Sequence, residues 1–100
     1  MTRPVRTARL ASEELAAAVR WYETQRPGLG VDFFDAVVEA LDRIAAHPEA
    51  GATAFGTINA RRMLVAGFPY QVVYRLGTED IRVIAFAHLK RRPGFWRQRR

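Results

Sequence analysis

The amino-acid sequence predicts an α+β fold, with an N-terminal strand and an antiparallel two-helix hairpin packed on a mainly antiparallel sheet. In the first half of the chain, apolar residues recur with the period of about 3.6 residues that is typical of helices. In the second half, the pattern changes to the alternation that is typical of strands. The chain has 100 residues, the size of one small domain, so we expect residues 1–100 to form a single domain.

A short strand and a helix open the predicted fold. Residues 5–10 favour β structure, and Pro4 limits the strand at its start. Ser12 is a candidate helix cap, because its hydroxyl can accept a hydrogen bond from a free backbone N–H. One apolar stripe runs along this helix, which ends at residues 27–30. The stripe consists of Leu15, Ala18, Val19 and Tyr22.

A second amphipathic helix follows. Asp32 is its candidate cap, and Pro48 ends it, because the residue before a proline is displaced from helical geometry. A capping role at this end accounts for His47. The short link between the helices predicts an antiparallel hairpin. The apolar stripe consists of Phe34, Val37, Val38, Leu41 and Ala45, with Phe33 and Ile44 at its edges.

A strand meander occupies the second half of the chain. Residues 48–60 lack a sustained period and are predicted to form a loop. Segments 61–66, 70–76 and 81–87 are rich in β-branched and aromatic residues, which predicts three consecutive antiparallel strands. A basic C-terminal tail, residues 88–100, follows. Apolar residues occur at both odd and even positions of the strands, so both faces of the sheet carry apolar side chains. We therefore expect the tail or a partner chain to cover the sheet face that the helices leave open.

The composition excludes several classes of function. The chain has no cysteine, so disulfides, thiolate metal sites and cysteine nucleophiles are impossible. Its two histidines have no clustered carboxylates and no phosphate-binding motif occurs, so neither a metal nor a cofactor is expected. The carboxylates lie mostly on the predicted helices, which argues against paired-carboxylate catalysis. No apolar run approaches the roughly 20 residues of a membrane span, and the N-terminus lacks a signal peptide, so we expect a cytoplasmic protein that contacts no membrane.

The positive charge is concentrated in the second half of the chain. The formal net charge is +6. The first fifty residues hold 6 basic and 8 acidic side chains, whereas residues 51–100 hold 10 basic and 2 acidic ones. Solubility alone does not require this asymmetry, which indicates an acidic or nucleic-acid partner for the basic half.

Three features of the basic half are candidate functional sites. Strand arginines can hold phosphates bidentately or line a solvated edge. His88 can act as a general acid or base, or it can fix the tail through a backbone hydrogen bond, which we favour. In the tail, basic residues flank Phe95 and Trp96, a combination that can bind nucleic acid or an acidic protein. We expect instead that Trp96 packs on the sheet and that the charged side chains are exposed. The candidate contact residues are Arg61, Arg62, Arg75, Arg82, Lys90, Arg91, Arg92, Trp96 and Arg97.

The order and spacing of several short motifs resemble the RelE/ParE superfamily of toxins from bacterial type II toxin–antitoxin modules. The motifs are Trp21-Tyr22, Pro27 to Phe33, His47-Pro48, Arg61 to Leu64, Phe68 to Arg75 and Ala87 to Trp96. The resemblance runs over most of the chain and implies a small antiparallel sheet with two helices. It also implies a growth-inhibiting toxin that a cognate acidic antitoxin neutralises in a hetero-oligomer.

The resemblance leaves two targets open. RelE-type members cut mRNA on the ribosome, and in that interpretation Arg62 would contact the scissile phosphate while His88 would move the 2′-OH proton. ParE-type members are associated with inhibition of DNA gyrase and lack the nuclease residues. Phe95 and Trp96 stand where such nucleases tend to offer a catalytic tyrosine. This departure favours a ParE-like, non-enzymatic inhibitor over a ribosome-dependent endonuclease.

Overall fold

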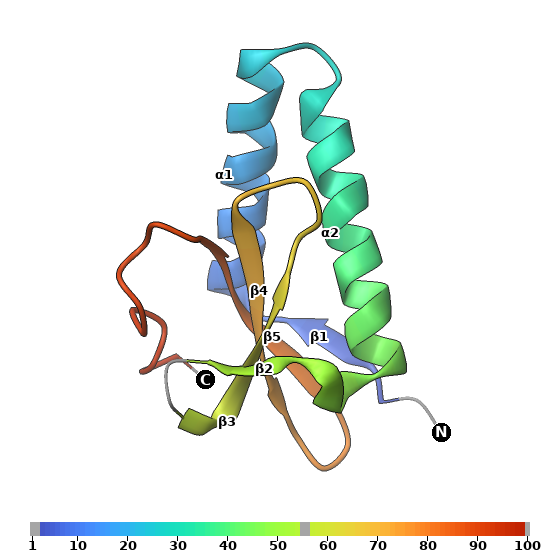
Figure 1. The fold of residues 1–100 in the computed structure, drawn as a ribbon, viewed down its shortest axis with the longest axis vertical. Coiled ribbons are helices and arrows are strands. Elements are labelled where there is room, and N and C mark those ends of the chain that lie inside the picture. Colours follow the sequence, from blue (N-terminus) through green and yellow to red (C-terminus); the bar gives the residue numbers. More distant parts are fainter. Residues whose placement is uncertain (1–2, 55–56, 100) are drawn as a thin grey trace.

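Two helices cover one face of a five-stranded sheet in the computed structural model, which describes residues 3–54 and 57–99 (Figure 1). The strands are β1 (Val5–Thr7), β2 (Ala52–Ala54), β3 (Thr57–Leu64), β4 (Tyr70–Leu76) and β5 (Ile81–His88). Their order across the sheet is β1-β5-β4-β3-β2. The pair of β1 and β5 is parallel, and the other three pairs are antiparallel. The predicted α+β class and the mainly antiparallel sheet are therefore confirmed.

Helix α1 (Arg9–Gln25) begins earlier than the sequence predicts. Strand β1 ends at Thr7 rather than at residue 10, because the Ala8 N–H donates to the Val83 carbonyl at 2.9 Å and the chain then turns directly into the helix. Ser12 lies one turn inside α1, where its N–H donates to the Ala8 carbonyl. The prediction of Ser12 as the cap is therefore wrong.

Helix α2 (Leu29–Ala46) also begins earlier than predicted, directly after Gly28. Gly28 has a φ of 90°, a left-handed conformation that glycine adopts without steric cost. The Asp32 N–H donates to the Gly28 carbonyl, so Asp32 lies in the first turn and its prediction as the cap is wrong. The Glu23 carboxylate of α1 satisfies the helix start instead, because it accepts hydrogen bonds from the N–H groups of Gly28 and Gly30, each at 3.0 Å. Glu23 thus joins the two helices of the hairpin.

The face of α2 that packs on the sheet is rotated from the predicted one. Phe34 and Val38, placed at the centre of the predicted stripe, are exposed. The buried residues of α2 are Gly30, Phe33, Val37, Ala40 and Ile44. Phe33 packs against Tyr22 of α1 with ring centroids 4.8 Å apart, which fixes the rotation of the helix. Within residues 3–54 and 57–99, neither helix is both long enough and apolar enough to cross a membrane.

The segment 48–60, predicted to be a loop, contains regular structure. It holds a 3-10 turn at Pro48–Ala50, strand β2 and the start of β3, while residues 55 and 56 lie outside the described part of the chain. Strand β2 pairs with β3, so the meander has four strands rather than three. A three-residue strand of alanine and threonine carries almost no periodicity, and its structure depends on the neighbouring strand.

Apolar side chains bury the sheet on both faces. Along β4, Tyr74 faces the helices and Val73 faces the other side. A bulge opposite these residues places both Ile84 and Ala85 of β5 on that second side, which explains the two adjacent apolar residues there. Trp96 of the tail packs against them with only 2% of its surface exposed. The tail, one of the two predicted covers, therefore covers the second face.

Replacing Glu23 by alanine should lower thermal stability at neutral pH, because two N–H groups at the start of α2 lose their acceptor. The same hydrogen bonds, first that from Gly28 and then that from Gly30, hold the pKa of Glu23 below its usual value. A carboxyl with a lowered pKa stabilises the fold above its unfolded-state pKa, and this stabilisation is lost as the pH falls. The difference in Tm between the two proteins should therefore shrink from about pH 7 to about pH 3.

Circular dichroism melts over this pH range measure the effect. The matched control is Glu39→Ala, which removes an exposed carboxylate from α2. The control should change the Tm little at any pH. An equal pH trend in both variants would contradict the role of Glu23.

Candidate functional site

The C-terminal tail is fixed on the sheet by side chains from several elements. Trp96 is buried beneath the tail and does not reach the surface. This confirms the prediction that Trp96 packs on the sheet. Arg75 of β4 donates hydrogen bonds to the carbonyl oxygens of Arg97 at 3.3 Å and Arg99 at 3.4 Å. The tail is therefore an ordered layer of the fold.

An ion pair between Glu14 of α1 and Arg99 anchors the end of the tail. Both guanidinium Nη atoms donate to the carboxylate, at 2.9 and 3.0 Å. The Glu14 side chain is only 18% exposed, and the Arg99 side chain is only 20% exposed. Arg99 also donates to the Ile84 carbonyl, and Glu14 also accepts from the Phe86 N–H. The expectation that all tail charges are exposed is therefore wrong for Arg99.

This ion pair also completes the hydrogen bonding of β5. Strand β1 pairs with β5 only as far as Val83, so among the described residues the edge of β5 beyond that point has no strand partner on this side. The Ile84 carbonyl and the Phe86 N–H lie in this stretch, and the ion pair satisfies both of them. The role of Glu14 is not predictable from the sequence, because no local pattern connects it to residues so far along the chain.

The sheet register separates the strand arginines by face. Because strand residues alternate between faces, Arg75 lies on the same side as Val73, beneath the tail. Arg62 pairs with Val73, and Arg82 pairs with Arg75. Arg62, Arg75 and Arg82 therefore share the tail side of the sheet.

Arg61 differs from these three. It pairs with Tyr74, on the helix side, and its guanidinium donates to the carbonyl oxygens of Glu49 at 2.9 Å and Gly51 at 3.0 Å. The Tyr74 hydroxyl donates to the Pro48 carbonyl in the same turn at 2.7 Å. Arg61 thus holds the turn between α2 and β2.

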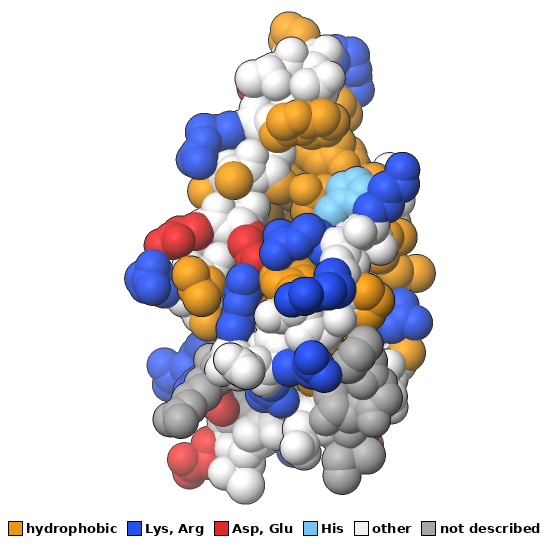
Figure 2. Space-filling model, turned by 90° about the vertical axis from the view of Figure 1, so that its left-hand side faces the viewer, with side chains coloured by type: hydrophobic (Ala, Val, Ile, Leu, Met, Phe, Trp, Pro, Cys, Tyr) orange, Lys and Arg blue, Asp and Glu red, His pale blue; other side chains and the backbone are white. Residues whose placement is uncertain are grey.

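A cationic surface covers the side of the molecule that carries the tail. Figure 2 shows Lys and Arg side chains gathered there, with hydrophobic side chains between them. Arg91 lies over the ring of Phe95, with its guanidinium carbon 3.8 Å from the ring centroid. Arg82 has a long ion pair of 4.0 Å with Asp80. We define the cationic surface as Arg62, Arg75, Arg82, Lys90, Arg91, Arg92 and Arg97.

A groove with a volume of about 360 Å³ separates α1 from the end of β5 and the start of the tail. It is lined by Glu14, Ala17, Ala18, Trp21, Tyr70, Phe86, His88 and Arg91. The Lys90 N–H donates to Nδ1 of His88 at 3.0 Å, which is the backbone bond expected of a histidine that fixes the tail. Burial raises the pKa of Tyr70, Glu14 raises it further and Arg91 opposes the change, so this phenol stays protonated at neutral pH.

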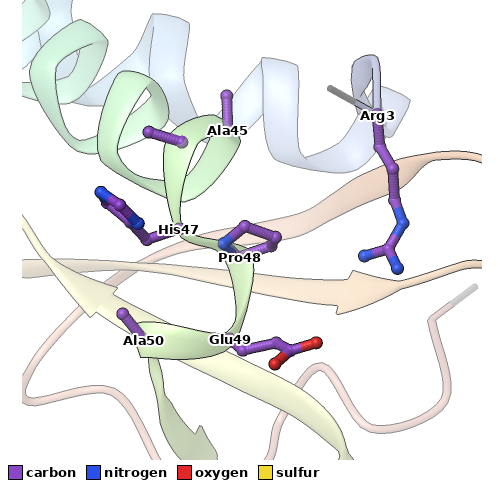
Figure 3. Close-up of a pocket in the computed structure, with 7 residues that line it drawn as sticks. Arg3, Ala45, His47, Pro48, Glu49 and Ala50 are labelled. Carbon is purple, nitrogen blue, oxygen red and sulfur yellow. The ribbon is translucent and has the colours of Figure 1, made fainter. Parts of the chain in front are cut away.

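A larger, open pocket of about 740 Å³ lies at the C-terminal end of α2. Figure 3 shows the side chains of Arg3 and Glu49 on one side of Pro48 and that of His47 on the other. The backbone N–H of His47 caps α2 by donating to the Arg43 carbonyl at 2.8 Å. In the described part of the chain, no three His, Asp or Glu side chains gather to hold a metal ion.

Comparison with known proteins places this fold in a family. Residues 5–93 match the family described as ParE toxin of type II toxin-antitoxin system, parDE. The chain belongs to the ParE toxin family. Its members are toxins of type II toxin–antitoxin systems, which confirms the favoured branch of the resemblance.

A solved structure shares the ParE-family fold seen here. It is titled "Chromosomal ParDE TA system from P. aeruginosa" and has a TM-score of 0.75 to this chain at 16% sequence identity. The match covers 86% of this chain and 95% of the other one. No curated protein matches the sequence significantly.

In this ParE-family chain, the two residues of the nuclease interpretation do not meet. His88 pairs with Tyr70, which packs against the helix-side core, so His88 lies on the helix side of the sheet. Arg62 lies on the tail side, opposite Val73. The structure therefore separates the candidate phosphate ligand from the candidate acid–base group by the thickness of the sheet.

Removing one partner of the Glu14–Arg99 ion pair should lower stability strongly. Glu14→Gln removes the charge that Arg99 faces in a mostly buried site, so we expect the free energy of unfolding to fall by about 2–4 kcal/mol. Urea unfolding at neutral pH measures this change.

A matched control lies on the same helix. Glu13 forms an exposed ion pair with Arg9 at 2.6 Å, and Glu13→Gln should cost about 0.5 kcal/mol or less. Equal effects of the two substitutions would contradict the anchoring role of Glu14.

Proposed function

We propose that this toxin inhibits growth by binding DNA gyrase, without catalytic chemistry, and that an acidic cognate antitoxin neutralises it. The observation that carries the proposal is the separation of Arg62 from His88 on opposite faces of the sheet. Cleavage of RNA needs a phosphate ligand and a proton-transfer group at one reacting centre. An inhibitor that acts by binding needs only a fixed, complementary surface.

The cationic surface has the properties that such binding requires. Trp96 and the Glu14–Arg99 ion pair fix the tail, so its side chains are positioned before a partner arrives. Arg91 is further oriented by its contact with Phe95. A positive surface also raises the rate at which an acidic partner associates.

The same surface suits an acidic antitoxin. The acidic side chains of residues 51–100 are Glu79 and Asp80, in the turn between β4 and β5, and of the cationic surface Arg82 lies within 4.0 Å of Asp80. An antitoxin that covers the cationic surface would compete with the target for it, which gives neutralisation a direct physical mechanism.

Purified toxin should block supercoiling by DNA gyrase at about micromolar concentration and leave ribosome-bound mRNA intact. A supercoiling assay and primer extension on translated mRNA, run with one toxin preparation, measure the two activities. Unimpaired supercoiling would overturn the gyrase proposal. Codon-positioned cleavage that both Arg62→Ala and His88→Ala abolish would establish the ribosome-dependent endonuclease in its place.

The toxin–antitoxin complex should weaken as salt screens the opposing charges. We expect its Kd to rise about tenfold or more between about 0.1 and about 0.5 M NaCl. The double variant Arg62→Gln/Arg82→Gln should show a shallower salt dependence in isothermal titration calorimetry. The control Arg20→Gln removes an exposed charge from α1 and should keep the wild-type slope. A Kd that does not change with salt would contradict an electrostatic role for the cationic surface.

A further inference from the structure

The outer face of α2 carries an apolar stripe and an acidic stripe that run side by side. Val31, Phe34 and Val38 form the apolar stripe and are exposed. An acidic residue directly follows each of them in the sequence, so the carboxylates lie next to the apolar side chains along the helix. The acidic stripe consists of Asp32, Asp35, Glu39 and Asp42. Both stripes point away from the sheet, because the buried residues of α2 occupy the other side of the helix.

The charge of the acidic stripe is poorly compensated within the chain. Its residues are three or four positions apart, so like charges are neighbours on the helix surface and repel one another. Among the described residues, the only ion-pair partner of the stripe is Arg26, which lies 3.7 Å from Asp32. Arg43, the one basic residue of α2, donates instead to the Leu64 carbonyl at 3.0 Å. The outer face of α2 therefore keeps most of its negative charge.

The tail side of the molecule carries the complementary pattern. Arg62 and Arg92 of the cationic surface are exposed. Beside them, the tail and the sheet enclose a hollow of about 290 Å³, which is room for a side chain. Leu89 lines this hollow with 48% of its surface exposed. Arg62 also lines it, and Arg92 directly precedes Pro93 at its wall. An exposed apolar side chain here lies next to positive charge, whereas on α2 it lies next to negative charge.

One chain cannot bring these two surfaces together. In Figure 1, α2 and the tail lie on opposite sides of the molecule, with α1 between them. Two copies can make the contact that one copy cannot. Such a contact joins different surfaces of the two copies, so it is a head-to-tail contact that leaves one surface of each kind free at the ends.

Charge favours a second copy of this chain as the occupant of the outer face of α2. This helix has four acidic side chains and one basic one, whereas residues 51–100 hold 10 basic and 2 acidic side chains. The acidic stripe repels an acidic protein and attracts the cationic surface of another toxin molecule. The apolar stripe adds burial to this attraction, and Phe34, with 46% of its surface exposed, is its largest member.

The size of the stripes makes the contact a weak one. From residue 31 to residue 42 the helix rises by about 17 Å. An interface of this length buries an area near the lower end of the range for specific complexes. Association should therefore depend on protein concentration.

We propose that the free toxin associates head to tail through these two surfaces. The outer face of α2 in one copy docks on the cationic surface of the next copy. Phe34 enters the hollow beside Leu89, and the carboxylates of the acidic stripe pair with Arg62 and Arg92. The contact covers the cationic surface of every copy but one, so a concentrated toxin masks the surface that the monomer presents. This inference holds whichever target the cationic surface binds.

Sedimentation velocity of the full toxin tests the association. In about 0.05 M NaCl, the average sedimentation coefficient should rise as the protein concentration increases from about 0.01 to about 0.5 mM. The apparent Kd of self-association should rise about tenfold or more in about 0.5 M NaCl. A toxin that stays monomeric over the whole concentration range at low salt would overturn the inference.

Two neutralising variants separate the halves of the contact. The α2 variant is Asp35→Asn/Glu39→Gln, and the tail variant is Arg62→Gln/Arg92→Gln. Each variant alone should raise the apparent Kd about tenfold or more. An equimolar mixture should form a 1:1 dimer with nearly the affinity of the unmodified contact, because one variant keeps an intact α2 and the other keeps an intact cationic surface.

The controls remove the same number of charges at exposed positions elsewhere. They are Glu13→Gln/Glu79→Gln for the acidic pair and Arg9→Gln/Arg20→Gln for the basic pair. Each control should change the apparent Kd by about twofold or less. Thermal melts establish that every variant is folded.

The mixture distinguishes a head-to-tail contact from a symmetric one. Association of the α2 variant with wild-type affinity would remove α2 from the interface and overturn the inference. Loss of association in both variants without recovery in their mixture would indicate a two-fold symmetric interface and would also overturn it. Neither result bears on the target of the monomer.

Discussion

The ion pair between Glu14 and Arg99 holds the second layer of the molecule in place. It joins α1, the open edge of β5 and the end of the tail through four hydrogen bonds. A partly buried pair of this kind gains little net free energy over an apolar pair, but removing one partner is costly. Its main effect is therefore on geometry: together with the hydrogen bonds of Arg75, it holds the tail on a path that keeps Trp96 buried against the sheet.

The fixed tail determines what the basic half of the chain presents to a partner. The sheet face that holds Arg62 and Arg75 is covered at its centre by Trp96, so Arg62 lies at the margin of a closed surface and Arg75 lies beneath the tail. His88 faces the opposite side and its Nδ1 is occupied by the tail backbone. The arrangement suits recognition of an acidic surface, which agrees with the proposed inhibition by binding.

The groove and the cationic surface both depend on this constraint. Arg91 reaches the groove because the tail turns directly after β5. The negative charge of Glu14 is compensated by the guanidinium of Arg99. If the tail moved away, the groove would lose its cation and regain an uncompensated carboxylate. The ion pair thus compensates the charge of Glu14, which lines the groove.

Local sequence patterns predicted the parts of the fold that depend on local interactions. The helix hairpin follows from periodicity, and β4 has the predicted bounds because Gly67 and Gly77 flank a segment rich in β-branched and aromatic residues. Strand β2 was missed because its pairing with Arg61 and Arg62 specifies it. The inner face of α2 was misplaced because the helix has two apolar stripes, and tertiary contacts such as those of Phe33 with Tyr22, Phe68 and Tyr70 distinguish them. Glu14 and Arg99 are 85 residues apart, beyond the reach of any local pattern.

Amide hydrogen exchange of the free toxin tests most directly whether the tail is a fixed layer. The N–H groups of Arg97 and Arg99 donate to the carbonyl oxygens of Gly94 and Trp96 at 3.0 and 2.9 Å. If the tail is fixed, these two amides should exchange at least about a hundredfold more slowly than in an unstructured peptide. Exchange of both amides at the rate of an unstructured peptide, with the amides of β5 still protected, would contradict the account.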